Sequence, residues 1–188
     1  MALSINDMKN GLTILVDGIV YQVVEFQHVK PGKGAAFVRT KLRNMKTGNL
    51  QEMTFRGEEK IEEAYIDERK LQFLYNSGEF YHFMDQENFE ELEIHKDTLG
   101  DKIKFLKDNL DVTSYSYKDD ILTVTLPNFI EFQIVHTEPG IKGDTAKSGT
   151  KPAKIETGAI IQVPLFVEET DRIKVDTRSG SYVERVVK

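Results

Sequence analysis

The sequence predicts an all-β protein built from three consecutive small β-barrels, over residues 1–63, 64–127 and 128–188. Two observations carry this prediction along the whole chain: short runs in which apolar and polar residues alternate, and tight-turn signals such as Asp17-Gly18 between them. A third is that helical periodicity is confined to one segment near 97–110. Each block holds about 60 residues, close to the lower size limit for an independent hydrophobic core.

The first block predicts a sheet of hairpins. LTILV and IVYQVVEF flank Asp17-Gly18, and AAFVRTKLR returns after the turn PGKG at residues 31–34. In that returning strand Val38, Thr40 and Leu42 alternate with basic residues, so a period of two places Arg39, Lys41 and Arg43 on one face. LQEMTFR follows a turn at Thr47-Gly48-Asn49.

The second block adds two β-hairpin patterns and the helix. KLQFLYN and EFYHFMD precede the helical segment, and DVTSYSYK and ILTVTLP follow it. Within 97–110 the apolar residues recur at helical spacing, and Asp97 or Thr98 is the expected N-cap. These apolar residues are Leu99, Ile103, Leu106 and Leu110.

The third block begins with FIEFQIVHT, in which Ile130, Phe132 and Ile134 alternate with Glu131 and Gln133. A long polar loop over residues 138–158 separates this strand from AIIQVPLFV. RIKVDT and SYVERVV close the block as a final hairpin pattern.

Composition limits the classes of function. The chain has 188 residues, a net charge of −6 and no cysteine, which excludes disulfides and thiolate metal sites and favours the cytoplasm. It lacks an apolar run of the roughly 20 residues that span a bilayer, and its first residues lack the pattern of a secretory signal. We therefore expect no membrane partner.

The charge is distributed unevenly. Residues 27–51 contain six basic and no acidic residues, whereas the remainder carries a net charge of −12. Lys33 lies between two glycines within this basic segment, which predicts an amine that reaches a phosphate-bearing partner. A solvated hairpin face explains the charge pattern alone equally well.

No enzymatic motif stands out. GKG at 32–34 lacks the spacing of a phosphate-binding loop. Asp144-Thr145-Ala146 resembles half of an aspartic protease site, but Asp176-Thr177-Arg178 is a poor second copy. The four histidines are scattered, without metal-ligand spacing. We expect a protein without catalytic residues, metal or cofactor.

Four segments together resemble the bacterial elongation factor P family: VKPGKGAAFVRTKLRN, SGEFYHFMD, EPGIKGDTAKSGTKPA and TGAIIQVPLFV. The resemblance covers essentially the whole chain in order. It implies an SH3-like (KOW-like) first barrel, two OB-fold barrels and an L-shaped outline similar to tRNA. It also implies a factor that binds both ribosomal subunits beside peptidyl-tRNA and relieves stalling at consecutive prolines.

The resemblance assigns roles to several residues. Lys33 matches the lysine that points at the tRNA acceptor end and that a modifying enzyme extends in many members, while Pro31, Gly32 and Gly34 shape the tip. The loop containing Gly143, Asp144, Thr145 and Lys151 is expected to face the small subunit and the exit-site mRNA codon. Thr170 is a departure, because many members have glycine there.

The remaining candidates rest on charge and aromaticity. Lys30, Arg39, Lys41 and Arg43 are the expected contacts to tRNA or rRNA. Tyr182 and Arg185 are candidates for stacking on or pairing with RNA, with packing against the neighbouring strand as the equal alternative. A factor that enters one site on a large particle is most simply a monomer.

Three alternatives stay open at this stage. One is a KOW/OB module that acts on free RNA in transcription or as an RNA chaperone. Another is a divergent paralogue of elongation factor P with altered target motifs. The third is a hydrolase built on scattered carboxylates.

Overall fold

The structure is a computed structural model that describes residues 2–32, 34–57, 59–139 and 149–186. It confirms the all-β class, with three sheets and one short α-helix. The chain divides into two compact units, which are Met1–Arg69 with Ser114–Val124, and Lys70–Thr113 with Thr125–Lys188. In the part of the chain that is described, no helix has the length and apolar character needed to cross a membrane.

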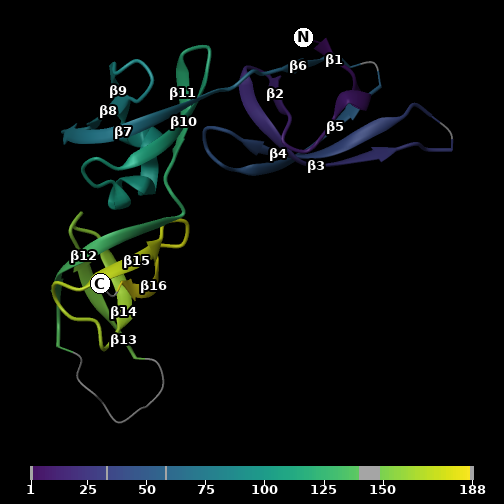
Figure 1. Cartoon of the computed structure of the whole chain (residues 1–188). Coiled ribbons are helices and arrows are strands. Elements are labelled where there is room, and N and C mark those ends of the chain that lie inside the picture. Colours follow the sequence, from purple (N-terminus) through teal and green to yellow (C-terminus); the bar gives the residue numbers. More distant parts are fainter. Residues whose placement is uncertain (1, 33, 58, 140–148, 187–188) are drawn as a thin grey trace. The chain divides into compact units, whose positions relative to one another are not determined.

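The first sheet has the strand order β1-β6-β2-β3-β4-β5 and follows the predicted hairpins (Figure 1). At the turn between β2 and β3 both residues have positive φ, 50° at Asp17 and 77° at Gly18, as a two-residue hairpin turn requires. The elements are β1 (Ala2–Leu3), the 3₁₀ helix η1 (Ile5–Asp7), β2 (Thr13–Val16), β3 (Ile19–Val29), β4 (Phe37–Asn44), β5 (Leu50–Arg56) and β6 (Ile61–Glu63).

The core of this sheet is formed by the inward positions of β2, β3 and β4. Ile14, Val23, Val38 and Leu42 are at most 1% exposed, and burial of each such side chain stabilises the fold by roughly 1.5–3 kcal/mol. A register shift between Val23 and Glu25 changes which residues of β3 face inward. Beyond this bulge Glu25 and Gln27 are exposed.

The second sheet has the order β11-β10-β7-β8-β9. Its hairpin β10–β11 belongs largely to the first unit, where Leu122 joins Val20 and Ala64 in a small separate core. The strands are β7 (Asp67–Ser77), β8 (Phe80–Asp85), β9 (Glu91–His95), β10 (Asp111–Tyr117) and β11 (Asp120–Thr125).

The helix predicted over 97–110 is much shorter and begins earlier. α1 spans Lys96–Leu99, and the 3₁₀ helix η2 spans Gly100–Phe105. His95 is the N-cap, and its side chain accepts a hydrogen bond from the Asp97 backbone N–H at 3.3 Å. Gly100 ends the α-helix because its φ of 55° and ψ of −137° lie outside the helical region. Leu106, although buried, is already extended.

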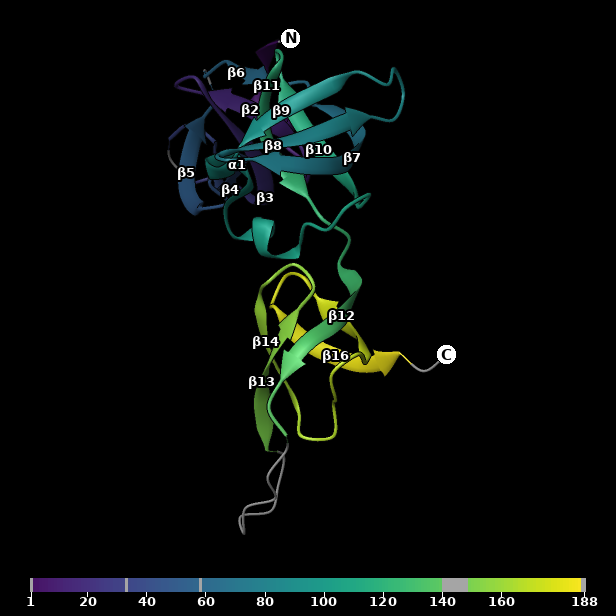
Figure 2. The same ribbon diagram turned by 90° about the vertical axis from the view of Figure 1, so that its left-hand side faces the viewer.

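The third sheet has the order β14-β13-β12-β15-β16, and Figure 2 shows β12, β13 and β14 side by side. The predicted alternation in β12 is confirmed, since Ile130, Phe132 and Ile134 are at most 5% exposed. The strands are β12 (Phe129–Thr137), β13 (Thr150–Ile155), β14 (Ile160–Pro164), β15 (Arg172–Asp176) and β16 (Ser181–Val186).

Candidate nucleic-acid interface

A prominent feature of the first unit is the hairpin of β3 and β4, here called the β3–β4 finger, whose end lies beyond the rest of the unit (Figure 1). The strand β5 pairs with β4 from Phe37 to Arg43, so the loop alone extends past the three-stranded part. The ladder of the finger continues to the pair Val29–Phe37. The inner face of β4 anchors it, because Val38 and Leu42 are fully buried and the Thr40 hydroxyl donates to the Met53 carbonyl at 3.0 Å. The finger therefore has a fixed base and a loop at its end.

The loop at the end of the finger spans residues 30–36. Lys30, Pro31, Gly32 and Gly34 are all exposed, and Lys33 lies outside the described residues. Gly34 has a φ of 112°, which L side chains rarely adopt. No such angle constrains Gly32, where an added Cβ would meet open space. The conformation thus requires glycine after Lys33, whereas it tolerates a side chain before it.

The outer face of β4 carries the predicted cations. Arg39 and Arg43 are exposed and Lys41 is half-buried, so the predicted alternation is correct. Lys41 is paired across the sheet with Glu25 on β3 and Glu52 on β5. Directly opposed charges stabilise a sheet by roughly 0.2–1 kcal/mol per pair. Lys41 therefore has a glutamate as its neighbour on each adjacent strand.

The two arginines have neutral cross-strand neighbours. Arg39 lies between Gln27 and Thr54. Its guanidinium carbon is 5.7 Å from the centroid of the Phe37 ring on the same face. Arg43 lies between Gln22 and Leu50. Among the cations of β4, the arginines are thus the ones whose charge is most available to a phosphate.

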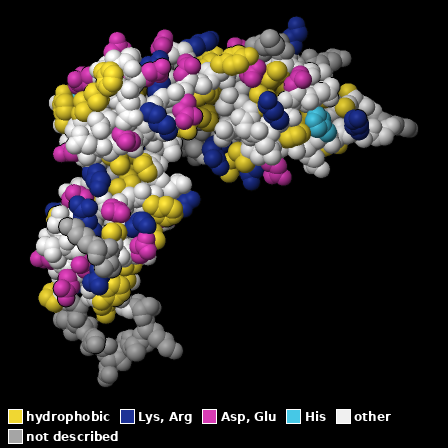
Figure 3. Space-filling model, viewed as in Figure 1, with side chains coloured by type: hydrophobic (Ala, Val, Ile, Leu, Met, Phe, Trp, Pro, Cys, Tyr) yellow, Lys and Arg dark blue, Asp and Glu magenta, His cyan; other side chains and the backbone are white. Residues whose placement is uncertain are grey.

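A shallow groove of about 510 Å³ follows this outer face and is lined by both signs of charge, with Arg39 and Lys41 beside Glu25 and Glu52. Figure 3 shows the same interspersion of basic and acidic side chains over the visible face of the first unit. The acid-free window in the sequence ends just short of both glutamates. Both glutamates lie outside this window in the sequence, and the pairing of β3 and β5 with β4 places them next to Lys41.

The second candidate region is the loop between β12 and β13. Gly143, Asp144 and Thr145 lie outside the described residues, but the base of the loop is well defined. Lys151 is only 7% exposed, and its amine donates to the Glu138 carbonyl at 2.6 Å. Lys151 therefore joins the two ends of the loop.

Glu169 also contacts the base of this loop. Its Oε1 accepts a hydrogen bond from the Thr137 backbone N–H at 3.2 Å and lies 2.8 Å from His136 Nδ1. The Thr137 N–H, followed by His136, lowers the pKa of the Glu169 carboxyl. The sequence pattern gave no signal for this residue, because its partners are more than 30 positions away in the chain.

Thr170 follows Glu169 and has a φ of 71°, in the left-handed region. Its backbone N–H donates to the Ile134 carbonyl at 3.0 Å, which fixes the turn on β12. Asp171 follows, with its Oδ2 2.9 Å from the Glu168 backbone N–H. The expected departure at Thr170 therefore coincides with a backbone conformation that favours glycine.

Arg185 and Tyr182 on β16 contact their own sheet. Arg185 Nη1 lies 3.5 Å from Asp171 Oδ2, and its guanidinium carbon is 5.7 Å from the centroid of the exposed Phe166 ring. Tyr182 is paired with Val175 and half-buried, and desolvation raises the pKa of its phenol. The Arg185 side chain remains 45% exposed, so it is the more accessible of the two.

The described residues contain no group of three or more His, Asp or Glu side chains placed to hold a metal ion. The described groups at the candidate regions are cations, glycines and paired carboxylates.

Three protein families match the chain in succession. Residues 4–61 match "Elongation factor P (EF-P) KOW-like domain", residues 66–124 match "Elongation factor P (EF-P) OB domain", and residues 123–185 match "Elongation factor P, C-terminal".

Two curated relatives are similar over nearly the full chain. Elongation factor P of Natranaerobius thermophilus is 56% identical over 181 residues, covering 96% of each protein. Elongation factor P of Moorella thermoacetica is 56% identical over 183 residues, covering 97% of this chain and 99% of the relative.

Among solved structures, eukaryotic translation initiation factor 5A from Methanococcus jannaschii is similar with a TM-score of 0.54 and 25% identity. The match covers 66% of this chain and 93% of that protein. A translation initiation factor eif-5a family protein from Naegleria fowleri, at 19% identity, shares the fold with the same TM-score over 67% of this chain and 98% of that protein.

Proposed function

Because this chain belongs to the bacterial elongation factor P family, which comprises translation factors and not enzymes, we propose that it binds the ribosome beside peptidyl-tRNA and stimulates peptide-bond formation at consecutive prolines. It does so by positioning the tRNA acceptor end with the tip that contains Lys33. The observation that supports this proposal is the exposed loop at the end of the β3–β4 finger, in which Gly34, the residue that follows Lys33 in the sequence, has a φ of 112°.

Proline is a poor substrate for peptide-bond formation because its ring fixes φ and restricts the geometry of attack. A factor that holds the acceptor end in a reactive pose lowers the barrier without supplying an acid, base or nucleophile. Positioning of this kind is worth up to roughly 7–11 kcal/mol. The ribosome supplies the reaction, and the factor supplies geometry through its tip.

Cations along the finger hold the factor on RNA. Arg39 and Arg43 are exposed with neutral cross-strand neighbours, so they contact phosphates, while Lys41 contributes less because Glu25 and Glu52 face it. Lys30, exposed next to the tip, extends the same track. The acidic remainder of the chain limits indiscriminate binding to RNA.

The loop between β12 and β13 acts at the small subunit. Gly143, Asp144 and Thr145 contact the exit-site codon there, and Lys151 holds the loop base through the Glu138 carbonyl. Arg185 adds a further RNA contact, and Tyr182 on the same strand is a second candidate for one. The protein acts in the cytoplasm as a monomer, and a modifying enzyme extends Lys33.

The experiment is a reconstituted translation assay on an mRNA with consecutive proline codons, with Lys33→Ala compared with the wild type. We expect the variant to bind ribosomes with similar affinity and to lose relief of stalling. Full relief by Lys33→Ala would overturn the role of the tip. Wild-type protein that binds naked RNA as tightly as it binds ribosomes would instead support a module acting on free RNA.

A further inference from the structure

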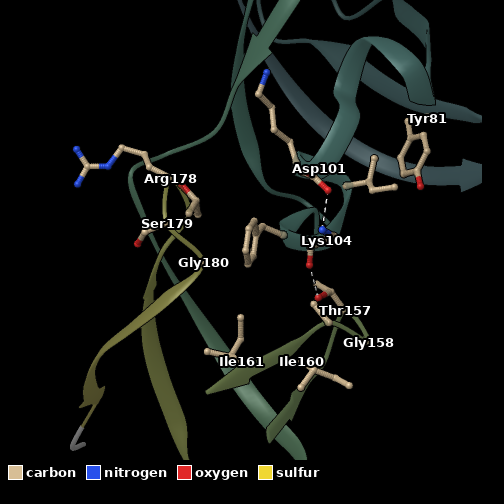
Figure 4. A pocket seen from close by; sticks show the side chains of 15 residues that line it. Tyr81, Asp101, Lys104, Thr157, Gly158, Ile160, Ile161, Arg178, Ser179 and Gly180 are labelled. Carbon is tan, nitrogen blue, oxygen red and sulfur yellow. Dashed lines mark hydrogen bonds and ion pairs between the residues drawn. The ribbon is translucent and has the colours of Figure 1, made fainter. Parts of the chain in front are cut away.

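The second unit contains a joint between η2 and the third sheet. Here η2 faces the β13–β14 turn at 157–159 and the β15–β16 turn at 177–180 around a cavity of about 950 Å³ (Figure 4). The residues after η2, Leu106 to Asp108, line a neighbouring cavity of about 310 Å³ with Glu156 and Thr157. The middle and last thirds of the chain are held together at this place, so the contacts across it decide how firmly the two are fixed.

The apolar part of the joint is centred on Phe105. This side chain is 7% exposed, and its ring centroid lies 6.1 Å from that of Phe132, a fully buried residue of β12. A Cβ added at Gly180 would lie 3.5 Å from the Phe105 ring, so the turn that contains Gly180 packs closely against this ring. The apolar contact of Phe105 holds η2 against the third sheet, but such a contact does not fix the orientation of one against the other.

Two hydrogen bonds to backbone carbonyls fix the orientation of the third sheet against the η2 segment. The Thr157 hydroxyl donates to the Lys104 carbonyl at 2.6 Å (Figure 4), and the Lys107 amine donates to the Glu131 carbonyl at 2.6 Å. Because the acceptors belong to the backbone, these contacts fix the position of one chain segment against another.

Of the two donors, Thr157 and Lys107, Lys107 makes more contacts. Its amine lies 3.8 Å from Glu156 Oε1 and 5.4 Å from the centroid of the Phe132 ring. Glu156 Oε1 in turn accepts a hydrogen bond from the Gln133 backbone N–H at 3.2 Å. The ammonium group of Lys107 therefore joins the segment that follows η2 both to β12 and to the end of β13.

We propose that Lys107 is a positioning residue for ribosome engagement: it holds the third sheet in one orientation against the η2 segment. This inference rests on the proposed function, in which the loop between β12 and β13 must reach its partner while the rest of the factor is bound. A loose joint would lose affinity because binding would have to order it.

The chain offers a matched control. Lys104 lies on the same segment, but its amine pairs locally with Asp101 at 2.6 Å, and only its backbone carbonyl contacts the third sheet. Lys107→Met keeps most of the apolar stem and removes the charge and the donor. Lys104→Met makes the same chemical change but removes only the local pair with Asp101, and the Lys104 carbonyl stays available to Thr157.

The orientation can be measured directly in the free protein. The chain has no cysteine, so the exposed positions Glu87 and Gln162 can be replaced by cysteine and spin-labelled without background. We expect the distance distribution between the two labels to broaden in Lys107→Met, to stay narrow in Lys104→Met and to narrow again in Lys107→Arg. Thr157→Val provides a second variant at the same joint and should broaden it as well.

Ribosome affinity is the second readout. Loss of a charge-assisted hydrogen bond at a partly exposed site should weaken binding by about three- to tenfold in Lys107→Met. Lys104→Met should bind as the wild type does. If the wild type binds ribosomes, an unchanged distance distribution or an unchanged ribosome affinity in Lys107→Met would overturn the role of Lys107 alone. Failure of the wild type to bind ribosomes would instead overturn the proposed function, and this inference with it.

Discussion

Replacement of Thr170 by glycine should stabilise the protein. Thr170 is a β-branched residue with a φ of 71°, and its side chain is exposed, so little packing offsets the conformational cost. A non-glycine residue in this region costs of the order of 1–3 kcal/mol. Glycine costs roughly 0.5–1 kcal/mol in added freedom of the unfolded chain. The expected net gain is therefore about 1 kcal/mol.

Urea unfolding followed by circular dichroism at neutral pH measures this gain. We expect a higher midpoint with an unchanged slope, and about 1 kcal/mol corresponds to a rise of roughly 2–4 °C in Tm for a chain of this size. Thr170→Ala is the control, because it removes the β-branch but retains a Cβ and should gain less. A Thr170→Gly protein no more stable than Thr170→Ala would refute the assignment of strain to the left-handed conformation.

Three further predictions concern the finger and the third sheet. Gly34→Ala should reduce relief of polyproline stalling at least severalfold, whereas Gly32→Ala should be nearly neutral, because only Gly34 has a φ of 112°; equal effects in the translation assay would contradict this. Arg39→Gln should weaken ribosome binding and flatten its salt dependence by about one unit of slope, more than Lys41→Gln does; titrations at several salt concentrations check this, and a larger effect at Lys41 would count against it. Arg178 donates to Asp176 from Nε at 3.0 Å and from Nη2 at 2.6 Å, and lowers the Asp176 pKa to about 2. A lowered pKa contributes stability above the unfolded value, so thermal unfolding should show Asp176→Asn less stable than the wild type above about pH 4, with the difference vanishing toward pH 2. A difference that persists at pH 2 would show that the pair is not its source.

Local patterns predicted local structure well. Asp17-Gly18 specified a hairpin, and the alternation in β4 and β12 specified which side chains are buried, because turn chemistry and period-two burial depend on neighbours in the chain. The prediction of a helix over 97–110 was too long. The helical spacing of its apolar residues gave no sign that the α-helix ends at Gly100. Gly100 leaves the helical region, and the following residues wind as 3₁₀ helix toward the third sheet.

The sites were harder to predict, since their properties come from distant residues. The basic stripe of β4 was foreseen, but Glu25 and Glu52 face Lys41 only after strand pairing. The resemblance assigns Lys151 to the loop that faces the small subunit, yet its amine donates to the Glu138 carbonyl, a contact that the sequence pattern does not indicate. Lys107 carried no sequence signal at all, because its partners lie on β12 and at the end of β13.

The rate of a single proline–proline peptide bond, measured by rapid quench on ribosomes saturated with the factor, tests the central claim most directly. With binding saturated, the wild type should raise this rate well above that of ribosomes alone, and Lys33→Ala should leave it near the unassisted value. An equal rate with the alanine variant would contradict a mechanism in which the amine at the end of the β3–β4 finger positions the acceptor end.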